Sequence, residues 1–465
     1  MLKSINLNPR KLFHGFSFTW LKVSVIVGVI IASISLPFVA TRFSLRYLNY
    51  LVALFPAIGV LLIIFREPVL GLVLTLLGGI FIPFTGPGGI NAVVLGLMVV
   101  IAVWILEMMV KERSISLISS RAILPAFAFV LIAVTTLLLG QLPWYPLAQG
   151  APLDAQVGGF FIYFLSAATL LLAAHLIRSE VWLQRLTWTF IIVGGAHLLA
   201  SFLRIDVITR LYQNGFVAQS MFWTWLVALA LGQGVFNQKL QWRYRAMLLG
   251  LVLLAFYIAY VQNGAWKSGY LPALAAAGVI ILFRYPKFTA ALIPLWILGA
   301  WYLGSQAIDT DFYSYGTRLD AWKIVLELAR VNLFFGLGFG NYYFFTSLIP
   351  IRGWYVNFNS HSQYVDIIAQ SGLVGLIVFF WIFLELGRSG WNLRTTVDKG
   401  FSQGFVYGVM GGLAGTLAAG FLVDWVLPFV YNIGFDGFRA SILPWLFMGG
   451  LVALEKLGTK AQEEG

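Results

Sequence analysis

The chain has 465 residues, of which 60% are hydrophobic and only 10% are charged, whereas soluble domains carry about 45 to 50% apolar residues, so the composition indicates an integral membrane protein. The formal net charge is +12, and in a membrane protein an excess of Lys and Arg indicates cytoplasmic loops that face anionic lipid before it indicates nucleic acid. The sequence has no cysteine and four histidines, which excludes a disulfide framework and a thiolate nucleophile and disfavours a histidine-rich metal centre.

Fourteen apolar segments are candidates for membrane spans, and two of them are short. They lie near residues 21–40, 48–65, 68–84, 91–110, 122–141, 157–177, 186–203, 216–236, 246–262, 270–283, 288–305, 372–387, 403–423 and 440–455. Because a span needs about 20 apolar residues, we predict an all-α polytopic membrane protein with about 12 to 14 transmembrane helices. We treat residues 1–465 as a single transmembrane domain, and we expect the first segment to remain as an anchor because it lacks a signal-peptide cleavage site.

The loops differ in their basic residues. If the N-terminus lies inside, the inner loops and the two ends hold 20 of the 30 Lys and Arg residues, which satisfies the positive-inside rule. Residues 306–371 then form one long extracytoplasmic loop. Charged side chains are rare in the spans, whereas this loop carries Arg318, Arg352 and His361, so we expect the chemistry to take place there.

Two helices are predicted within this loop. Thr317 and Asp320 have the spacing of a capping box. Apolar residues then recur at three and four positions at Leu319, Trp322, Leu326, Ala329 and Leu333. This pattern indicates an amphipathic helix that lies on the membrane or on the bundle. Ser360 and Gln363 repeat the capping-box spacing and predict that a second helix opens there.

Arg318 and His361 are each predicted in the first turn of one of these helices. A cation there opposes the helix dipole at a cost of roughly a few tenths of a kcal/mol, so local stability does not require Arg318. Its guanidinium group has the geometry to bind phosphate oxygens. The same dipole keeps the imidazole of His361 neutral, as a general base requires. The alternatives are a solvated helix face for Arg318 and a structural or surface residue for His361.

The sequence GLGFGNYY, with glycine at positions 336, 338 and 340, lies between these helices. Consecutive backbone N–H groups in such a segment can cradle a phosphate, but glycine-rich turns are common, and a tight structural turn is the favoured interpretation. The segment is not a Walker loop, because no GK[ST] ending and no preceding strand accompany it.

The order of these motifs resembles the bacterial O-antigen ligase and O-antigen polymerase superfamily. The matching positions are Arg318 with Trp322, Gly336, Gly338 and Gly340, His361, and Gly372 with Gly375. They cover about 60 residues closely, and the many spans with one long late loop extend the resemblance over most of the chain. The sequence departs from the family at Lys267, where the family usually has arginine, and at Gln370, where it often has glutamate.

The resemblance implies a glycosyltransferase in the bacterial inner membrane with its active loop on the extracytoplasmic face. Its donor would be a glycan linked to undecaprenyl diphosphate, and its acceptor a lipid or a glycan. Arg318, Lys267 and the auxiliary Arg352 would bind the diphosphate, while His361 would accept the proton of the acceptor hydroxyl and the anomeric configuration would invert. We expect no metal or other cofactor, because basic side chains can stabilise the leaving group and the only close acidic pair in the loop is Asp309 with Asp311.

Several alternatives remain open from the sequence. A ligase, which we favour slightly, and a polymerase share the donor and the motifs and differ in the acceptor. A transporter of lipid-linked sugars or polysaccharide would place charges near the middle of its spans, and the spans here are nearly free of them. A structural partner in a cell-envelope assembly would not require Arg318, His361 and the glycines between them.

Overall fold

The fold is known from a computed structural model, which describes residues 59, 61–112, 118–262, 267–287, 291, 294, 298 and 312–463. The chain divides into two units, Met1–Arg66 and Glu67–Gly465. In the first unit the described residues 59 and 61–66 are helical. The second unit contains all the elements named below. The interpretation of the chain as a single domain stays a prediction.

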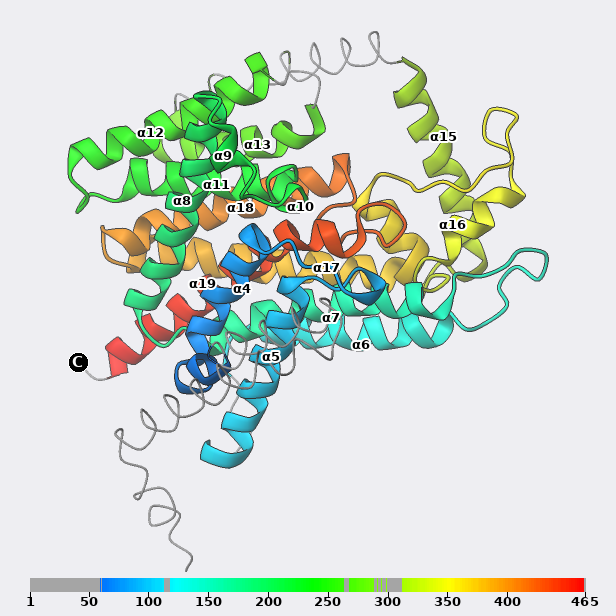
Figure 1. Cartoon of the computed structure of the whole chain (residues 1–465), viewed down its shortest axis with the longest axis horizontal. Helices are drawn as coiled ribbons and strands as arrows, with labels where there is room; N and C mark the ends of the chain where they lie inside the picture. Colours follow the sequence, from blue (N-terminus) through cyan, green and yellow to red (C-terminus); the bar gives the residue numbers. More distant parts are fainter. Residues whose placement is uncertain are drawn as a thin grey trace, which may run out of the picture. The chain divides into compact units, whose positions relative to one another are not determined.

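The second unit is built from helices (Figure 1). The longer ones are α4 (Pro68–Phe81), α5 (Ala92–Leu106), α6 (Ile123–Leu139), α7 (Leu153–Leu176), α8 (Glu180–Phe202), α11 (Ser220–Phe236), α12 (Trp242–Tyr257), α13 (Lys267–Arg284), α15 (Phe312–Ala329), α17 (Gln363–Thr396), α18 (Phe401–Leu422) and α19 (Gly434–Glu463). The short helices α9 (Asp206–Thr209), α10 (Asn214–Val217) and α16 (Asn341–Phe345) lie in the connections. The described residues contain no β-strand, which confirms the prediction of an all-α protein.

Seven described helices are long and apolar enough to cross a membrane, counting α5 and α12 with the irregular turns that extend them. Four more apolar helices are shorter, at Pro68–Phe81, Ile123–Leu139, Ser220–Phe236 and Gly269–Arg284. Each of these eleven coincides with a predicted span. The predicted span at 21–40 and most of those at 48–65 and 288–305 lie outside the described residues.

The helix α19 forms the centre of the second unit. An apolar stretch of 18 residues within it is completely buried, and the helix packs mainly against α7, with α10, α18, α11 and α17 around it. The close crossing of α11 and α18 depends on small residues, because a Cβ atom on Gly232 would lie 2.7 Å from the Cα of Gly408. Small residues at helix crossings allow the close backbone packing on which membrane bundles rely.

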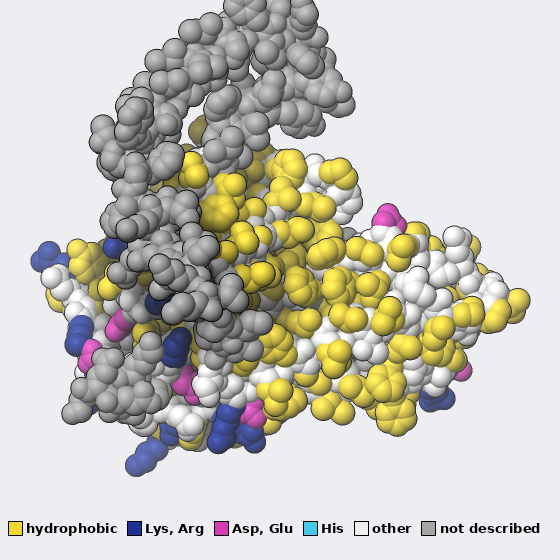
Figure 2. Space-filling model, turned by 90° about the horizontal axis from the view of Figure 1, so that it is seen from below, with side chains coloured by type: hydrophobic (Ala, Val, Ile, Leu, Met, Phe, Trp, Pro, Cys, Tyr) yellow, Lys and Arg dark blue, Asp and Glu magenta, His cyan; other side chains and the backbone are white. Residues whose placement is uncertain are grey.

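Hydrophobic and basic side chains are separated on the surface of the second unit, as is usual for a membrane protein. Hydrophobic side chains form a broad band in Figure 2, while most of the visible Lys and Arg side chains gather at one end of that band. The loops at residues 237–241 and 397–400 and the start of α8 lie at this end in Figure 1. The same loops were predicted to be cytoplasmic from their basic residues.

The helix α17 contains a sharp break that the sequence did not predict. Gly372 has φ 71° and ψ −172°, which separates a short first part from a long second part. The two parts fold back on each other, since the ring centroids of Tyr364 and Phe380, 16 residues apart in the sequence, lie 5.2 Å from each other. The predicted span at 372–387 is thus the second part of α17, and the first part belongs to the loop.

The predicted amphipathic helix is α15, but it begins at Phe312, five residues before Thr317. Its buried residues are Ala321, Ile324, Val325, Leu328 and Ala329. All of these except Ala329 belong to one hydrophobic cluster with Tyr342, Phe345 and Phe429. The predicted apolar face is therefore only partly right. Leu319 is exposed, and the buried face of the helix is rotated toward Ala321 and Val325.

Arg439 is a buried cation that holds the end of α4. Its guanidinium group donates to the carbonyl oxygens of Gly79 at 3.2 Å, Ile82 at 3.0 Å and Phe84 at 2.9 Å, while its Nε donates to Asp436 at 3.0 Å. These carbonyls lie at and just beyond the C-terminus of α4, where no intrahelical donor is left for them.

Arg439→Met is therefore expected to destabilise the folded protein by about 3 kcal/mol or more, because several buried acceptors lose their donor at once. The check is the thermal unfolding midpoint in detergent. Arg210→Met is the matched control, since Arg210 is exposed. Equal midpoints for the two variants would show that the bonds to α4 contribute nothing.

Candidate functional site

A cavity of about 540 Å³ opens beside the start of α17. Its walls come from α15, from α16, from the loop between α16 and α17, and from the loop that follows α18. The lining residues are Thr317, Arg318, Ala321, Tyr343, Ile351, Asn357, Phe358, Asn359, His361, Tyr431 and Asn432. The structure thus brings together Arg318 and His361, which are 43 positions apart in the sequence. Both were predicted from the sequence to be site residues.

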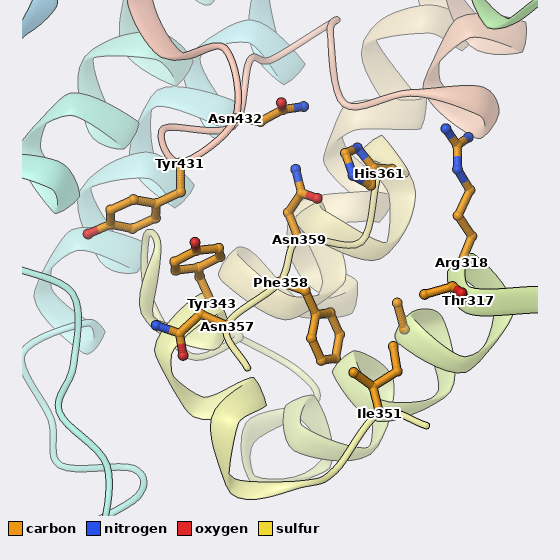
Figure 3. A pocket seen from close by; sticks show the side chains of 11 residues that line it. Thr317, Arg318, Tyr343, Ile351, Asn357, Phe358, Asn359, His361, Tyr431 and Asn432 are labelled. Carbon is orange, nitrogen blue, oxygen red and sulfur yellow. The ribbon is translucent and has the colours of Figure 1, made fainter. Parts of the chain in front are cut away.

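The side chains divide the cavity into two sides. Figure 3 shows Arg318 on one side and the tyrosines 343 and 431 on the other, with His361 and Asn359 between them. The two tyrosine rings are stacked, with 4.7 Å between centroids. One side is therefore cationic, and the other combines aromatic rings with amide groups.

His361 does not lie in the first turn of a helix, as the capping-box spacing predicted. The helix begins at Gln363 with Ser362 in the N-cap position, so His361 precedes it. Its φ angle is 51°, in the left-handed region. This region costs most residues about 1 to 2 kcal/mol, although histidine is found there more often than most.

Hydrogen bonds of the flanking residues Ser360 and Ser362 stabilise this backbone conformation. The indole Nε1 of Trp322 donates to the carbonyl oxygen of Ser360 at 2.7 Å. The Ser360 hydroxyl oxygen lies 2.7 Å from a carboxyl oxygen of Asp366 and accepts the N–H of Ser362 at 3.0 Å. Tyr342 donates to the same Asp366 oxygen. Because the neighbouring peptide is anchored, His361 is presented to the cavity in one orientation.

Arg318 also differs from its predicted position. It lies in the second turn of α15 rather than at its start, so its charge is not placed against the positive end of the helix dipole. Its Nη1 donates to the carbonyl oxygen of Leu422 at 3.2 Å, at the last residue of α18. A guanidinium group carries five N–H donors, so this bond orients Arg318 while leaving donors for a ligand in the cavity.

Asp424 is the part of the site that sequence reasoning missed. Its carboxylate is fully buried and accepts from Asn432 at 2.8 and 3.0 Å and from Asn359 at 3.3 Å. The only local signal is an isolated acidic residue directly after an apolar span, in LVDWV. Gln363 ties this loop to α17, since its side-chain oxygen accepts the N–H of Leu427 at 2.7 Å.

The pKa of His361 is shifted by this environment. Burial of the imidazole lowers its pKa below the ordinary value, the Asp424 carboxylate opposes this by raising the pKa, and the Arg318 cation lowers it. Burial also raises the pKa of Asp424, while the hydrogen bonds from Asn432 lower it. The net lowering keeps His361 neutral at neutral pH, through burial rather than through the helix terminus that the sequence predicted.

The glycine segment, residues 336–340, is structural. The N–H of Leu337 donates to Ala369 at 2.8 Å, that of Gly338 to Gln370 at 3.0 Å, and that of Gly340 to the Gln370 side chain at 3.2 Å. These donors are consumed by the first part of α17, so they cannot cradle a phosphate. Gln370 needs no charge for this role, which accounts for an amide at that position.

The two other predicted cations are placed differently. Arg352 is not among the residues that line the cavity, and its Nε pairs with Asp320 at 3.1 Å. Lys267 is the first residue of α13, and its side chain lies outside what the structure describes. The acidic pair Asp309 and Asp311 also lies outside the described residues. The roles of Lys267 and Arg352 at a diphosphate stay predictions.

Comparison with known proteins supports the resemblance seen in the motifs. Residues 243–380 match a family model described as O-Antigen ligase. A search of curated proteins found no match to the chain. The matched region contains α15, the glycine segment, His361 and the break in α17, but it ends before Asp424. Over residues 243–380 the chain is therefore similar to the O-antigen ligase family, in agreement with the superfamily that its motifs resemble.

Proposed function

We propose that this protein transfers a glycan from undecaprenyl diphosphate to an acceptor hydroxyl on the extracytoplasmic face, with a lipid A core or a similar lipid as acceptor. The observation that supports the proposal most strongly is that Arg318 and a neutral, half-buried His361 line the same cavity. A cation and a base at one site are the two groups that displacement of a diphosphate by a hydroxyl requires.

The proposed reaction is a single displacement. The acceptor oxygen attacks the anomeric carbon, and the bond from that carbon to the phosphate oxygen breaks. The electron pair of that bond leaves with undecaprenyl diphosphate, whose developing negative charge Arg318 stabilises. One ring nitrogen of His361 accepts the hydroxyl proton. Because attack and departure take place on opposite faces of the carbon, the anomeric configuration inverts.

The opposite wall of the cavity suits a sugar. Asn357 and Asn432 present amide groups there, Asn359 presents another between the two sides, and Tyr343 and Tyr431 present aromatic rings. Amide donors and acceptors can bond sugar hydroxyl groups, and the apolar faces of a pyranose can pack on a tyrosine ring. This wall supports a glycan, rather than a simple phosphate ester, as the group transferred.

The main alternative is a polymerase of the same superfamily, in which the acceptor is a second lipid-linked glycan. It uses the same cation and base. A transporter is less well supported, because a neutral, half-buried histidine that shares a cavity with an arginine at the end of the helices does not form a charged pathway across the spans.

The test is a transfer assay in proteoliposomes with undecaprenyl-diphosphate oligosaccharide as donor. Wild-type protein would be supplied with donor alone and with donor plus lipid A core, each in EDTA, with a His361→Asn variant as the site control. Product that depends on added lipid A core supports the ligase, and a ladder from donor alone supports the polymerase. No product with either acceptor would contradict glycosyl transfer.

The pH dependence of transfer is expected to follow His361. Because burial lowers its pKa, the rate should rise with pH below about 6.5, the ordinary value for histidine, and then stay level up to neutral pH. Asp424→Asn removes a carboxylate that raises this pKa, so its acid limb should move to lower pH. Arg318→Gln removes a cation that lowers the pKa, so the limb of its residual activity should move to higher pH.

Measuring rate against pH for the three proteins checks these signs. Shifts in the same direction for Asp424→Asn and Arg318→Gln would show that the variants act through general damage to the site, and that His361 is not the group that titrates.

A further inference from the structure

A second cavity lies on the outer face of α17, and the proposed reaction does not use it. It is a groove of about 1140 Å³ between α17, the start of α6 and α18. The residues that line it are Arg121, Ile377, Phe380, Trp381, Phe383, Leu384, Gly387, Arg388, Trp391, Asn392 and Leu417. None of them lines the cavity at His361.

The groove has an apolar part and a cationic end. Ile377 and Leu384 leave 65% and 52% of their surface exposed, whereas Arg388 and Trp391 follow on the same face one to two turns later. From Ile377 to Gly387 the helix rises about 15 Å. That length is about half of the roughly 30 Å hydrocarbon core, which is the depth of one leaflet.

The floor of the groove is open at Gly387. A Cβ atom added there would have no other atom within 4 Å. Beside it, Arg388 donates to Glu385 at 2.7 Å through one nitrogen, and its side chain is still 54% exposed. Among the described residues, no hydrogen bond or ion pair engages the exposed Arg121 side chain. Two guanidinium groups are thus available at one end of an apolar groove.

We propose that this groove binds an anionic phospholipid of the surrounding membrane. Arg121 and Arg388 hold its phosphate, since guanidinium groups bind phosphate oxygens in pairs of hydrogen bonds. One acyl chain lies along Leu384 and Phe380, over the open space at Gly387. Trp391 occupies the level of the headgroups, which is usual for tryptophan in membrane proteins.

The position of the cations distinguishes this occupant from the tail of a lipid-linked donor. Arg121 lies just before α6, and the other end of α6 reaches Gly140, whose carbonyl oxygen accepts from Asn341 beside the glycine segment at 2.8 Å. That separation is about 28 Å along the helix. If the diphosphate of a donor lies at His361, only the hydrocarbon of its polyprenyl tail can reach Arg121 and Arg388. Hydrocarbon does not require two cations.

Native mass spectrometry of the purified full-length protein tests the proposal. The protein would be supplied with equal amounts of phosphatidylglycerol and phosphatidylcholine of the same chain length. Wild type is expected to retain one phosphatidylglycerol in preference to phosphatidylcholine. Gly387→Leu fills the groove without a clash, and Arg121→Gln removes a phosphate ligand, so each should reduce that retention about tenfold.

The control is Arg185→Gln, which removes an arginine that lies over Trp182 at 4.6 Å, outside the groove, and it should retain the lipid like wild type. Arg388 is left unchanged, because its removal would strand the buried Glu385. Equal retention of the two lipids, unchanged retention by Gly387→Leu, or displacement of phosphatidylglycerol by undecaprenyl monophosphate would each overturn the proposal.

Discussion

His361→Asn is expected to lower the rate of glycan transfer by about 10² to 10⁴, the usual contribution of a general base. The asparagine side chain has no nitrogen that can accept a proton at neutral pH. It is nevertheless among the residues that best tolerate a positive φ, so it suits the 51° of this position. The loss should therefore appear in the chemical step, with the folded structure retained.

Alanine is a less informative replacement for the same histidine. At φ 51° it adds backbone strain of about 1 to 2 kcal/mol, so its effects on folding and on catalysis would be mixed. His361→Gly removes the imidazole without strain and leaves space beside a cavity of about 540 Å³. Added imidazole should restore part of its activity if the role of His361 is proton transfer.

The measurement is the initial rate in proteoliposomes at saturating donor, with the unfolding midpoint of each variant determined in parallel. Lys323→Ala is the control within the loop, because Lys323 is exposed on α15 and does not line the cavity. Wild-type rates for His361→Asn would show that the histidine is structural, and a variant that fails only because it unfolds would be recognised from its midpoint.

The membrane helices could be predicted because their signal is local. A run of about 20 apolar residues spans a bilayer whatever its neighbours are, and the eleven apolar helices that are described coincide with predicted spans. The break at Gly372 could not be predicted in this way. It depends on the backbone of Phe334, whose carbonyl oxygen lies 2.2 Å from where a Cβ atom on Gly372 would be, and that contact crosses about 40 residues of sequence.

The site also combines residues with a local sequence signal and residues that are placed by tertiary contacts. Arg318 and His361 were found because their residue types are unusual in an apolar chain. The capping-box rule then misplaced His361, since Ser360 uses its hydroxyl on the buried Asp366 instead of capping a helix, and Ser362 takes the N-cap position. Asp424 reaches the site through hydrogen bonds to Asn359 and Asn432. Periodicity and spacing carry no information about such tertiary contacts.

Gly338→Ala is expected to prevent the protein from reaching its folded state. The φ angle of Gly338 is 93°, and a Cβ atom there would lie 2.1 Å from the Cα of Gly140. Neither backbone can move easily. The N–H of Gly338 donates to Gln370 at 3.0 Å, and Asn341 donates to the carbonyl oxygen of Gly140 at 2.8 Å. The overlap would separate the end of α6 from the glycine segment.

Gly353→Ala is the matched control, because it isolates the strain of a positive φ from this overlap. Gly353 has φ 86°, close to that of Gly338, but a Cβ atom there would have no other atom within 4 Å. Gly353→Ala should therefore lower the free energy of unfolding by only about 1 to 2 kcal/mol. Gly338→Ala should lower it by about 4 kcal/mol or more, which is typical of severe defects such as backbone overlap.

The yield of monodisperse protein and its thermal unfolding midpoint measure the difference. Similar midpoints for the two variants would mean that α6 and the glycine segment are not in close contact. A large difference would show that the glycines of the resemblance motif are needed for packing. They would then support catalysis indirectly, because Leu337, Gly338 and Gly340 bind the first part of α17, and that part of the helix begins two residues after His361.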